Sequence, residues 1–189
     1  MVGGRSTRMG VPKATLDVGG RTLGQVAVDA LRGAGVSTCA AVGGDPRWAA
    51  GLGLVHVPDP IPFAGPLPAI AVALRWAEAL ADVLVLLACD HPDLGASDVS
   101  ALLEGLRRAP GALTAVPVDP DGRRQPFPAA WRTTARRAVE DQVEAGQRRA
   151  SAAWIPPVCT AVLRADAMVD LDDPASLEAW KHRTNRTAP

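Results

Sequence analysis

The first chemically suggestive residues of this chain lie in a loop at its beginning. The segment GGRSTRMGVPK places Gly3 and Gly4 close to two arginines, Arg5 and Arg8, and reaches a lysine at Lys13. Glycines let backbone N–H groups approach phosphate oxygens, and cationic side chains neutralise phosphate charge. The loop therefore predicts a polyphosphate site, with a solvated basic turn as the alternative for this stretch taken alone.

The spacing within this loop excludes two common nucleotide-binding motifs. A Walker loop needs a lysine directly after its last glycine and then Ser or Thr, whereas two residues separate Gly10 from Lys13 and Ala14 follows. The dinucleotide fingerprint needs glycines at its first, third and sixth positions, which Gly3, Gly4 and Gly10 do not supply. We therefore expect neither a P-loop nor a Rossmann dehydrogenase.

A carboxylate follows a continuously apolar segment in the middle of the chain. VLVLLA, at residues 83–88, reads as a buried parallel strand, and Cys89 and Asp90 come directly after it. A carboxylate at the carboxyl end of such a strand projects into the ligand crevice, where a hard oxygen donor suits Mg²⁺. Asp90 is thus the predicted metal ligand, with a turn or helix-cap role as the alternative and Asp93 as a second candidate. Cys89 is predicted to be a small core residue.

A second carboxylate lies in a segment interrupted by proline and glycine. DPIPFAGPL runs from Asp59 to Leu67, between a predicted strand and a predicted helix. The breaks let backbone groups and Asp59 face the cleft at the sheet edge. A structural interpretation, with Asp59 as a turn former and Gly65-Pro66 as the helix start, is compatible with this one.

These residues need a scaffold, and the hydrophobic pattern predicts alternating strands and helices. Helices are expected at 22–34, 67–80, 97–108 and 133–145, and strands at 38–42, 54–57, 83–88 and 112–118. This alternation predicts an α/β fold: an open, mostly parallel sheet in three layers. Ligands of such sheets bind beyond the carboxyl ends of the strands.

Length, charge and cysteine usage restrict the class of protein. The 189 residues suit one domain, expected at residues 1–181, with a polar, disordered tail at 182–189. Basic and acidic residues balance at 20 each, so we expect no nucleic-acid or membrane partner. The scattered Cys39, Cys89 and Cys159 lack metal-ligand spacing and suit a reducing cytoplasm. Neither a membrane-spanning run nor a signal peptide is recognised.

The order of three motifs resembles the MobA family of molybdenum cofactor guanylyltransferases. These motifs are GG-x-S-x-R-M-G-x-x-K, DPIPFAGPLPAIAVAL and LLACDHPDL, and the resemblance covers most of the chain. It implies a three-layer α/β/α, Rossmann-like, GT-A-like nucleotidyltransferase fold. It also implies Mg²⁺-dependent transfer of GMP from GTP to molybdopterin or the molybdenum cofactor, with release of pyrophosphate, and transient contacts with cofactor carriers or acceptor enzymes.

The resemblance also implies roles for individual residues. Lys13 and Arg8 would be catalytic, and Asp90 would hold the metal. The nucleotide would contact Val2, Gly3, Gly4, Arg5, Ser6, Lys13, Asp59, Gly65 and Asp90.

Acceptor recognition is expected from two later segments. DGRRQPFPAAWR resembles the family stretch near the acceptor site, so Arg123 or Arg124, with Gln125, is a candidate for holding a pterin phosphate, against a solvated hairpin charge as the alternative. In MVDLDDPASLEAW, Asp170 and Asp172 stand where family members often carry asparagine. Carboxylates accept hydrogen bonds but do not donate them, whereas asparagine amides do both. The replacement of asparagine by aspartate is therefore compatible with a related acceptor substrate or with a second contact to the metal.

Departures from the family pattern keep other functions open. Ala69 replaces a glycine that family members tend to have, which would narrow the approach to a ligand. The alternatives are a cytidylyltransferase for the same pterin, another small nucleotidyltransferase, or a GTP-binding paralogue without transfer activity. Gly3-Gly4 favours guanine, because cytidylyl relatives tend to have Ala-Gly.

The beginning of the chain is the last unusual feature. Family members begin with an apolar strand of about five residues that runs into Gly-Gly, whereas here Met1 and Val2 precede Gly3. We therefore expect the first strand to be truncated in this sequence and the true start to lie upstream.

Overall fold

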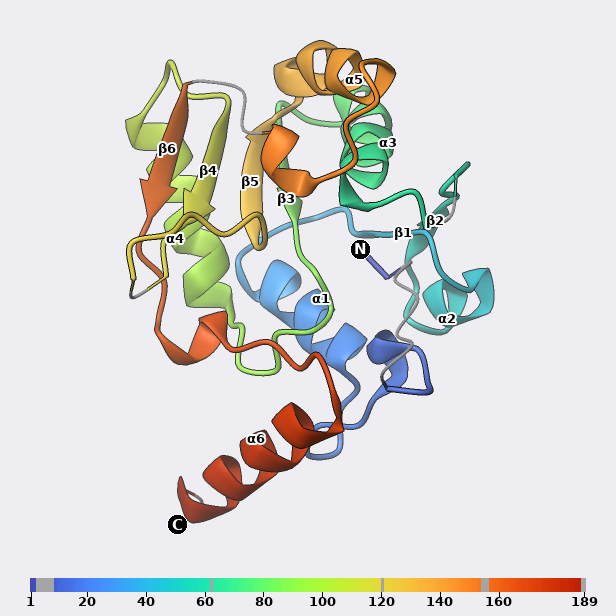
Figure 1. Cartoon of the computed structure of the whole chain (residues 1–189), viewed down its shortest axis with the longest axis vertical. Helices are drawn as coiled ribbons and strands as arrows, with labels where there is room; N and C mark the ends of the chain where they lie inside the picture. Colours follow the sequence, from blue (N-terminus) through green and yellow to red (C-terminus); the bar gives the residue numbers. More distant parts are fainter. Residues whose placement is uncertain (3–8, 62, 120, 154–156, 188–189) are drawn as a thin grey trace.

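Helices and strands alternate along most of the chain in the computed structural model, which describes residues 1–2, 9–61, 63–119, 121–153 and 157–187 (Figure 1). The α-helices are α1 (Leu23–Gly33), α2 (Pro46–Gly51), α3 (Pro66–Glu78), α4 (Ala96–Arg108), α5 (Arg136–Glu144) and α6 (Pro174–Thr187). The strands are β1 (Ala40–Val42), β2 (Val55–Val57), β3 (Val83–Leu86), β4 (Thr114–Pro117), β5 (Ala129–Arg132) and β6 (Val158–Ala161). Short 3₁₀ helices lie at η1 (Lys13–Thr15), η2 (Thr133–Ala135), η3 (Ala150–Ala153) and η4 (Asp166–Met168).

Local signals explain where these helices begin. Thr22 starts α1 with a capping box, because its side chain accepts from the Gln25 amide while the Gln25 side chain accepts from the Thr22 amide. Helix α2 was not predicted, because its six residues are too few to show a hydrophobic period. It begins at Asp45, whose side chain accepts from the Arg47 amide, with Pro46 in the first turn.

The strands form two hydrogen-bonded sets. Strands β1 and β2 pair in parallel, with Ala41 opposite His56. The other set has the order β3-β5-β4-β6. Strand β5 runs antiparallel to both of its neighbours, whereas β4 and β6 are parallel. The prediction of an α/β fold with a mostly parallel sheet is confirmed, and the antiparallel β5 is the feature that the sequence pattern did not indicate.

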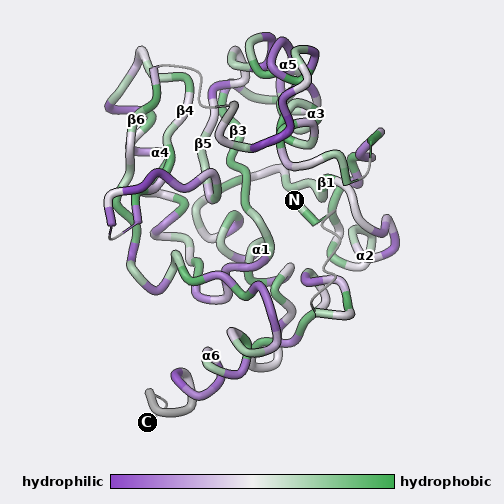
Figure 2. The backbone as a smooth tube through the Cα atoms, viewed as in Figure 1, coloured by the Kyte–Doolittle hydropathy of each residue, from purple (hydrophilic) through white to green (hydrophobic). Residues whose placement is uncertain are grey.

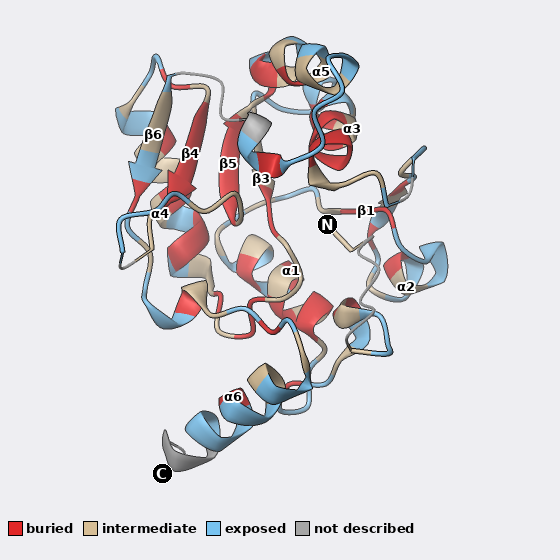
Figure 3. Ribbon diagram, in the orientation of Figure 1, coloured by how far each residue is buried: buried red, intermediate tan, exposed pale blue. Residues whose placement is uncertain are grey.

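Residues on successive positions of the strands face opposite layers. Val116 and Trp131 belong to a core cluster with α3 and α5, whereas Ala115 and Ala130 pack with α4. Helix α1 joins α4 on that second side. Hydrophobic residues follow β3 and the inner sides of the helices in Figure 2, and β4 and β5 are buried along most of their length in Figure 3. This is the predicted three-layer arrangement, with the core divided between the two faces of the sheet.

Helix α6 extends to Thr187, so residues 182–187 of the expected polar tail are helical. Asp173 starts the helix by accepting a hydrogen bond from the Ser176 amide, and Trp180 and Arg183 bond to Asp93. Most of α6 faces solvent (Figure 3), which suits its polar sequence. Within the described part of the chain, none of the helices has the length and apolar character needed to cross a membrane.

Candidate functional site

The site centres on Lys13, which contacts carboxylates from two distant parts of the chain. Its Nζ atom lies 3.1 Å from Asp90 Oδ2 and 2.7 Å from Asp172 Oδ1. Lys13 opens η1, Asp90 follows β3, and Asp172 lies just before α6. The structure therefore brings together three residues that the sequence analysis assigned to phosphate, metal and acceptor binding.

Asp90 is placed by its backbone as well as by its position after β3. Its carbonyl oxygen accepts a hydrogen bond of 2.9 Å from the Leu171 amide, which brings the segment before α6 alongside it. Its Oδ1 atom is buried without a hydrogen-bond partner among the described residues, and His91 Nε2 lies 3.7 Å away. A buried carboxylate oxygen without a donor is a position at which a cation or a ligand proton would be stabilised.

Electrostatics fix the protonation of this cluster. Burial alone would lower the pKa of Lys13, but the hydrogen bonds and charges of Asp172 and Asp90 outweigh it and raise that pKa above its ordinary value of 10.5. Burial, followed by the charges of Asp172 and Asp90, raises the pKa of Asp170 above 3.8. Lys13 is therefore a stable cation at neutral pH, inside a locally acidic environment.

Lys13 and Asp90 line a hollow of about 450 Å³ with several of the predicted nucleotide contacts. The other predicted contacts in its wall are Val2, Asp59 and Gly65. Ala69 also lines it, so its methyl group occupies space at the position where the sequence analysis expected a narrowed approach.

The loop that carries Asp59 and Gly65 has a defined backbone. Asp59 Oδ1 accepts from the Ile61 amide, as in an Asx turn. Gly65 has φ +102°, and a Cβ atom there would lie 2.7 Å from the Arg148 carbonyl oxygen, so glycine is required. Pro66 then starts α3. The residues that start the helix therefore also border the hollow.

A second hollow, of about 560 Å³, adjoins the first and was missed by the sequence analysis. Val2, Asp59 and Phe63 line both hollows. The remaining wall of the second includes Gly43, Gly44, Asp45, Trp48 and His56. The sequence carries a signal for it in Gly-Gly-Asp-Pro at residues 43–46, directly after the predicted strand at 38–42. Together the hollows give an extended space at the carboxyl ends of β1 and β2.

Arg123 and Gln125, the predicted acceptor contacts, lie in the connection between β4 and β5. The Gln125 side chain donates to Asp119 Oδ2 at 2.7 Å, and the Arg123 guanidinium lies 3.3 Å from Asp121. Neither residue belongs to the walls of these two hollows. These contacts stabilise the connection itself.

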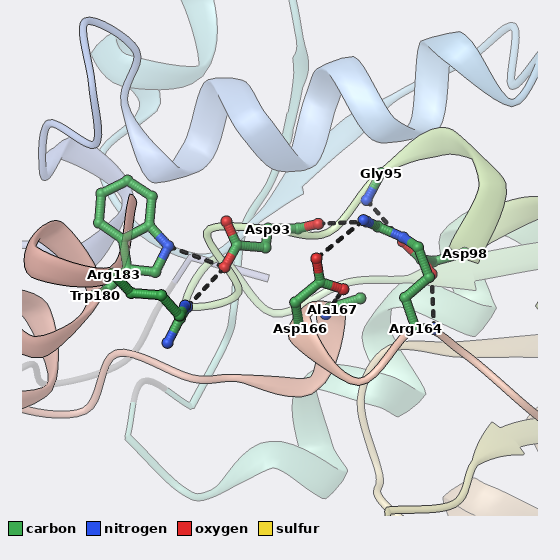
Figure 4. Close-up of polar contacts among 8 residues, drawn as sticks. All are labelled: Asp93, Gly95, Asp98, Arg164, Asp166, Ala167, Trp180 and Arg183. Atoms are coloured by element: carbon green, nitrogen blue, oxygen red, sulfur yellow. Dashed lines mark hydrogen bonds and ion pairs between the residues drawn. The ribbon is translucent and has the colours of Figure 1, made fainter. Parts of the chain in front are cut away.

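Two acidic residues anchor the segment that carries Asp170 and Asp172 (Figure 4). Asp93 Oδ2 accepts from Trp180 Nε1 at 2.9 Å and from Arg183 Nη2 at 2.9 Å. Buried Asp98 Oδ2 accepts from Arg164 Nη2 at 2.8 Å. Asp93 was the second metal candidate, but its two hydrogen bonds hold α6 against the loop after β3.

Several of the predicted nucleotide contacts lie outside the described part of the chain. Gly3, Gly4, Arg5, Ser6 and Arg8 belong to the residues that the structure does not describe. Among the described residues, no group of three or more His, Cys, Asp or Glu side chains has the geometry to hold a metal by itself. Any cation at Asp90 would therefore need ligands from a substrate or from water.

The sheet is an open α/β sheet, and a lysine, carboxylates and a glycine-bordered hollow lie together at the ends of its strands. This arrangement is typical of domains that bind nucleotides beyond the carboxyl ends of the strands. The chain belongs to the MobA-like NTP transferase domain family, whose profile it matches over residues 1–158. The predicted family is thereby confirmed.

Individual relatives agree with this family. A segment of 76 residues is 42% identical to the molybdenum cofactor guanylyltransferase of Rhizobium meliloti strain 1021 and covers 40% of this chain and 35% of that protein. A segment of 94 residues is 39% identical to the molybdenum cofactor guanylyltransferase of Cereibacter sphaeroides and covers 49% of this chain and 48% of that protein. The matched segments thus span less than half the length of these curated relatives.

A solved structure matches over nearly the whole chain. The crystal structure of molybdopterin-guanine dinucleotide biosynthesis protein A from Archaeoglobus fulgidus has a TM-score of 0.74 at 17% identity. The match covers 98% of this chain and 97% of that one. It confirms the predicted nucleotidyltransferase fold.

Proposed function

We propose that the chain transfers GMP from GTP to the terminal phosphate of molybdopterin or of its molybdenum-loaded form. The observation that carries the proposal is Lys13, held by Asp90 and Asp172 at the wall of a hollow that Asp59 and Gly65 also border. Membership of the MobA-like family and the names of the curated relatives support the choice of reaction.

The proposed reaction is an in-line displacement. An oxygen of the acceptor phosphate attacks the α-phosphorus of GTP, the bond between that phosphorus and the bridging oxygen breaks, and pyrophosphate leaves with the electron pair. The phosphate nucleophile is already ionised at neutral pH, so no general base is needed. Lys13 exchanges its contact with Asp172 for a phosphate oxygen and stabilises the charge that develops in the transition state. Arg8 and the glycine loop assist by neutralising and orienting the triphosphate.

Asp90 is the residue that would hold Mg²⁺. Its buried Oδ1 atom has no donor among the described residues, and its carboxylate supplies the hard oxygen that this cation prefers. The remaining ligands would come from substrate phosphates and water, which agrees with the isolated position of Asp90. When bound, the ion neutralises phosphate charge.

A GTP-binding domain without transfer activity is the second candidate. The observation that favours it is the 2.7 Å contact between Lys13 Nζ and Asp172 Oδ1, because a carboxylate at this position competes with phosphate for the lysine. Asp170 adds a further carboxylate nearby, and two asparagines would not compete in the same way.

One product assay separates these functions. The purified chain is incubated with Mg²⁺, molybdopterin and either GTP or CTP, and products are identified by mass together with released pyrophosphate. The proposal expects a guanylylated pterin and one pyrophosphate per product. A cytidylylated pterin would instead identify a cytidylyltransferase, and tight GTP binding without product would identify the second candidate. Failure to bind either nucleotide would contradict all three functions.

A further inference from the structure

Both phenylalanines of the chain line the hollow that contains Lys13 and Asp90. The sequence has two phenylalanines, Phe63 and Phe127, and no tyrosine. They come from different connections, because Phe63 lies between β2 and α3 whereas Phe127 lies between β4 and β5. The proposed reaction gives neither of these rings a role.

Phe63 lies where the two hollows adjoin. It is 57% exposed, although phenylalanine is among the side chains that gain most from burial. Its φ of +66° falls in the left-handed region, which bulky residues seldom adopt. The ring lines both hollows. A strained backbone that holds an exposed ring beside a hollow is typical of a ligand contact, because burial against the ligand would offset the cost.

Phe127 is held more firmly than Phe63. It is half-buried and packs against the core cluster that contains Val42 and Ala69, which also line the first hollow. Arg123 and Gln125 belong to the same connection but not to the wall of this hollow. The connection between β4 and β5 therefore contributes an aromatic ring to the hollow, where the sequence analysis expected polar acceptor contacts.

The wall of the first hollow combines charged and apolar groups. Lys13, Asp59 and Asp90 supply the charges. A polyphosphate alone would leave the phenyl rings uncovered, and an apolar molecule alone would not use Lys13. A phosphate joined to a planar heterocycle satisfies both, because aromatic side chains stack on such rings. The rest of the apolar wall includes Val2, Val42, Pro66, Ala69 and Ala88.

We propose that Phe63 and Phe127 bind the planar heterocycle of a substrate whose phosphate lies at Lys13. The inference rests on the proposed function and deepens it, because it assigns recognition of the ring to residues other than those that bind phosphate. The guanine of GTP and the pterin of the acceptor share the required chemistry, since each is a flat, nitrogen-rich ring system. Stacking does not depend on the exact identity of the ring.

Incorporation of 4-fluorophenylalanine tests this proposal, because two phenylalanines give two fluorine NMR signals. The variants Phe63→Leu and Phe127→Leu assign the signals. The labelled full chain is titrated with inorganic triphosphate, GTP or molybdopterin, each in the presence of Mg²⁺. We expect at least one of the two ring-bearing substrates to shift both signals, and inorganic triphosphate to shift them much less. A response to GTP identifies guanine as the bound ring, and a response to molybdopterin identifies the pterin.

Calorimetric titration of variants measures how much the rings contribute. Phe63→Leu and Phe127→Leu keep an apolar side chain but remove the stacking face, so each should weaken binding of the same substrate by about tenfold. Their affinity for inorganic triphosphate should stay unchanged. Phe63→Tyr keeps the ring and should bind like the wild type. Ile61→Ala is the matched control, because Ile61 is 55% exposed in the same loop but does not line the hollow.

The outcomes separate this inference from the proposed function. Binding of GTP and molybdopterin that moves neither fluorine signal, with wild-type affinity in both leucine variants, would overturn the inference and leave the proposed function intact. Ring-dependent binding without a guanylylated product would support the inference and contradict the proposed function. Failure of all three probes to bind would overturn both.

Discussion

Lysine occurs at two positions of the chain, Lys13 and Lys181, and their surroundings differ. The Lys13 side chain is 16% exposed between two carboxylates, whereas Lys181 is 46% exposed and pairs with Glu178 on the surface of α6. We expect Lys13→Ala to lower guanylyl transfer by about 10² or more, because a preorganised charge near the reacting phosphate is lost. Lys181→Ala removes the same charge from the surface and should leave the rate unchanged. Near-normal turnover of the Lys13 variant would contradict its catalytic role.

Asp172 tests whether a carboxylate competes with phosphate for Lys13. Its side chain is 55% exposed, so we expect Asp172→Asn to tighten GTP binding only by about two- to fivefold, the range of a partly exposed ion pair. Asp29→Asn is the matched control, because Asp29 lies on α1, is 52% exposed and pairs with Arg21. Calorimetric titration with GTP measures the change. Weaker binding by the Asp172 variant would instead show that this carboxylate supports the site.

At the scale of elements, acid should loosen the attachment of the segment around Arg164 to α4. Burial alone would raise the pKa of Asp98, but hydrogen bonds from Arg164 and Gly95 outweigh it and hold the pKa below its ordinary value of 3.8. A lowered folded-state pKa gives stability that is present above the unfolded pKa and is lost as pH falls through the folded one. The urea midpoint should therefore fall below about pH 4.

The variant Asp98→Asn isolates this contribution from that of other carboxylates. It should have a lower urea midpoint than the wild type at pH 7, because Arg164 loses its charged partner. The difference between the two proteins should shrink as pH falls below about 4, since Asp98 of the wild type becomes neutral as well. A difference that stays constant across this range would mean that the titration of Asp98 does not control the attachment.

Comparison of the elements with the sequence shows which features local patterns can predict. Apolar periodicity and capping residues predicted helices α1, α3, α4 and α5 and strands β1 to β4, because these signals are local. The contact between Lys13 and Asp172 joins residues 159 positions apart and depends on the path of the chain before α6. Likewise, Asp93 resembled a metal ligand until Trp180 and Arg183 were found beside it. Local patterns located Lys13 and Asp90, but tertiary packing decided which side chains meet.

At the scale of the whole molecule, the two sets of strands should differ in local stability. Strands β3 to β6 form a continuous hydrogen-bonded set, whereas β1 and β2 meet it only through the helices and through Met1 and Val2 in the described part of the chain. Regions with fewer tertiary restraints open with a smaller free energy than the global one.

Hydrogen exchange under native conditions can measure this difference with two matched bonds. The Gly43 amide donates to the Val57 carbonyl oxygen at 2.9 Å in the smaller set, and the Arg132 amide donates to the Leu113 carbonyl oxygen at 2.9 Å in the larger one. We expect protection of Gly43 to be lower by about tenfold or more, because β1 and β2 can open without the other strands. Equal protection of Gly43 and Arg132 would mean that helix packing alone already makes the sheet one cooperative unit.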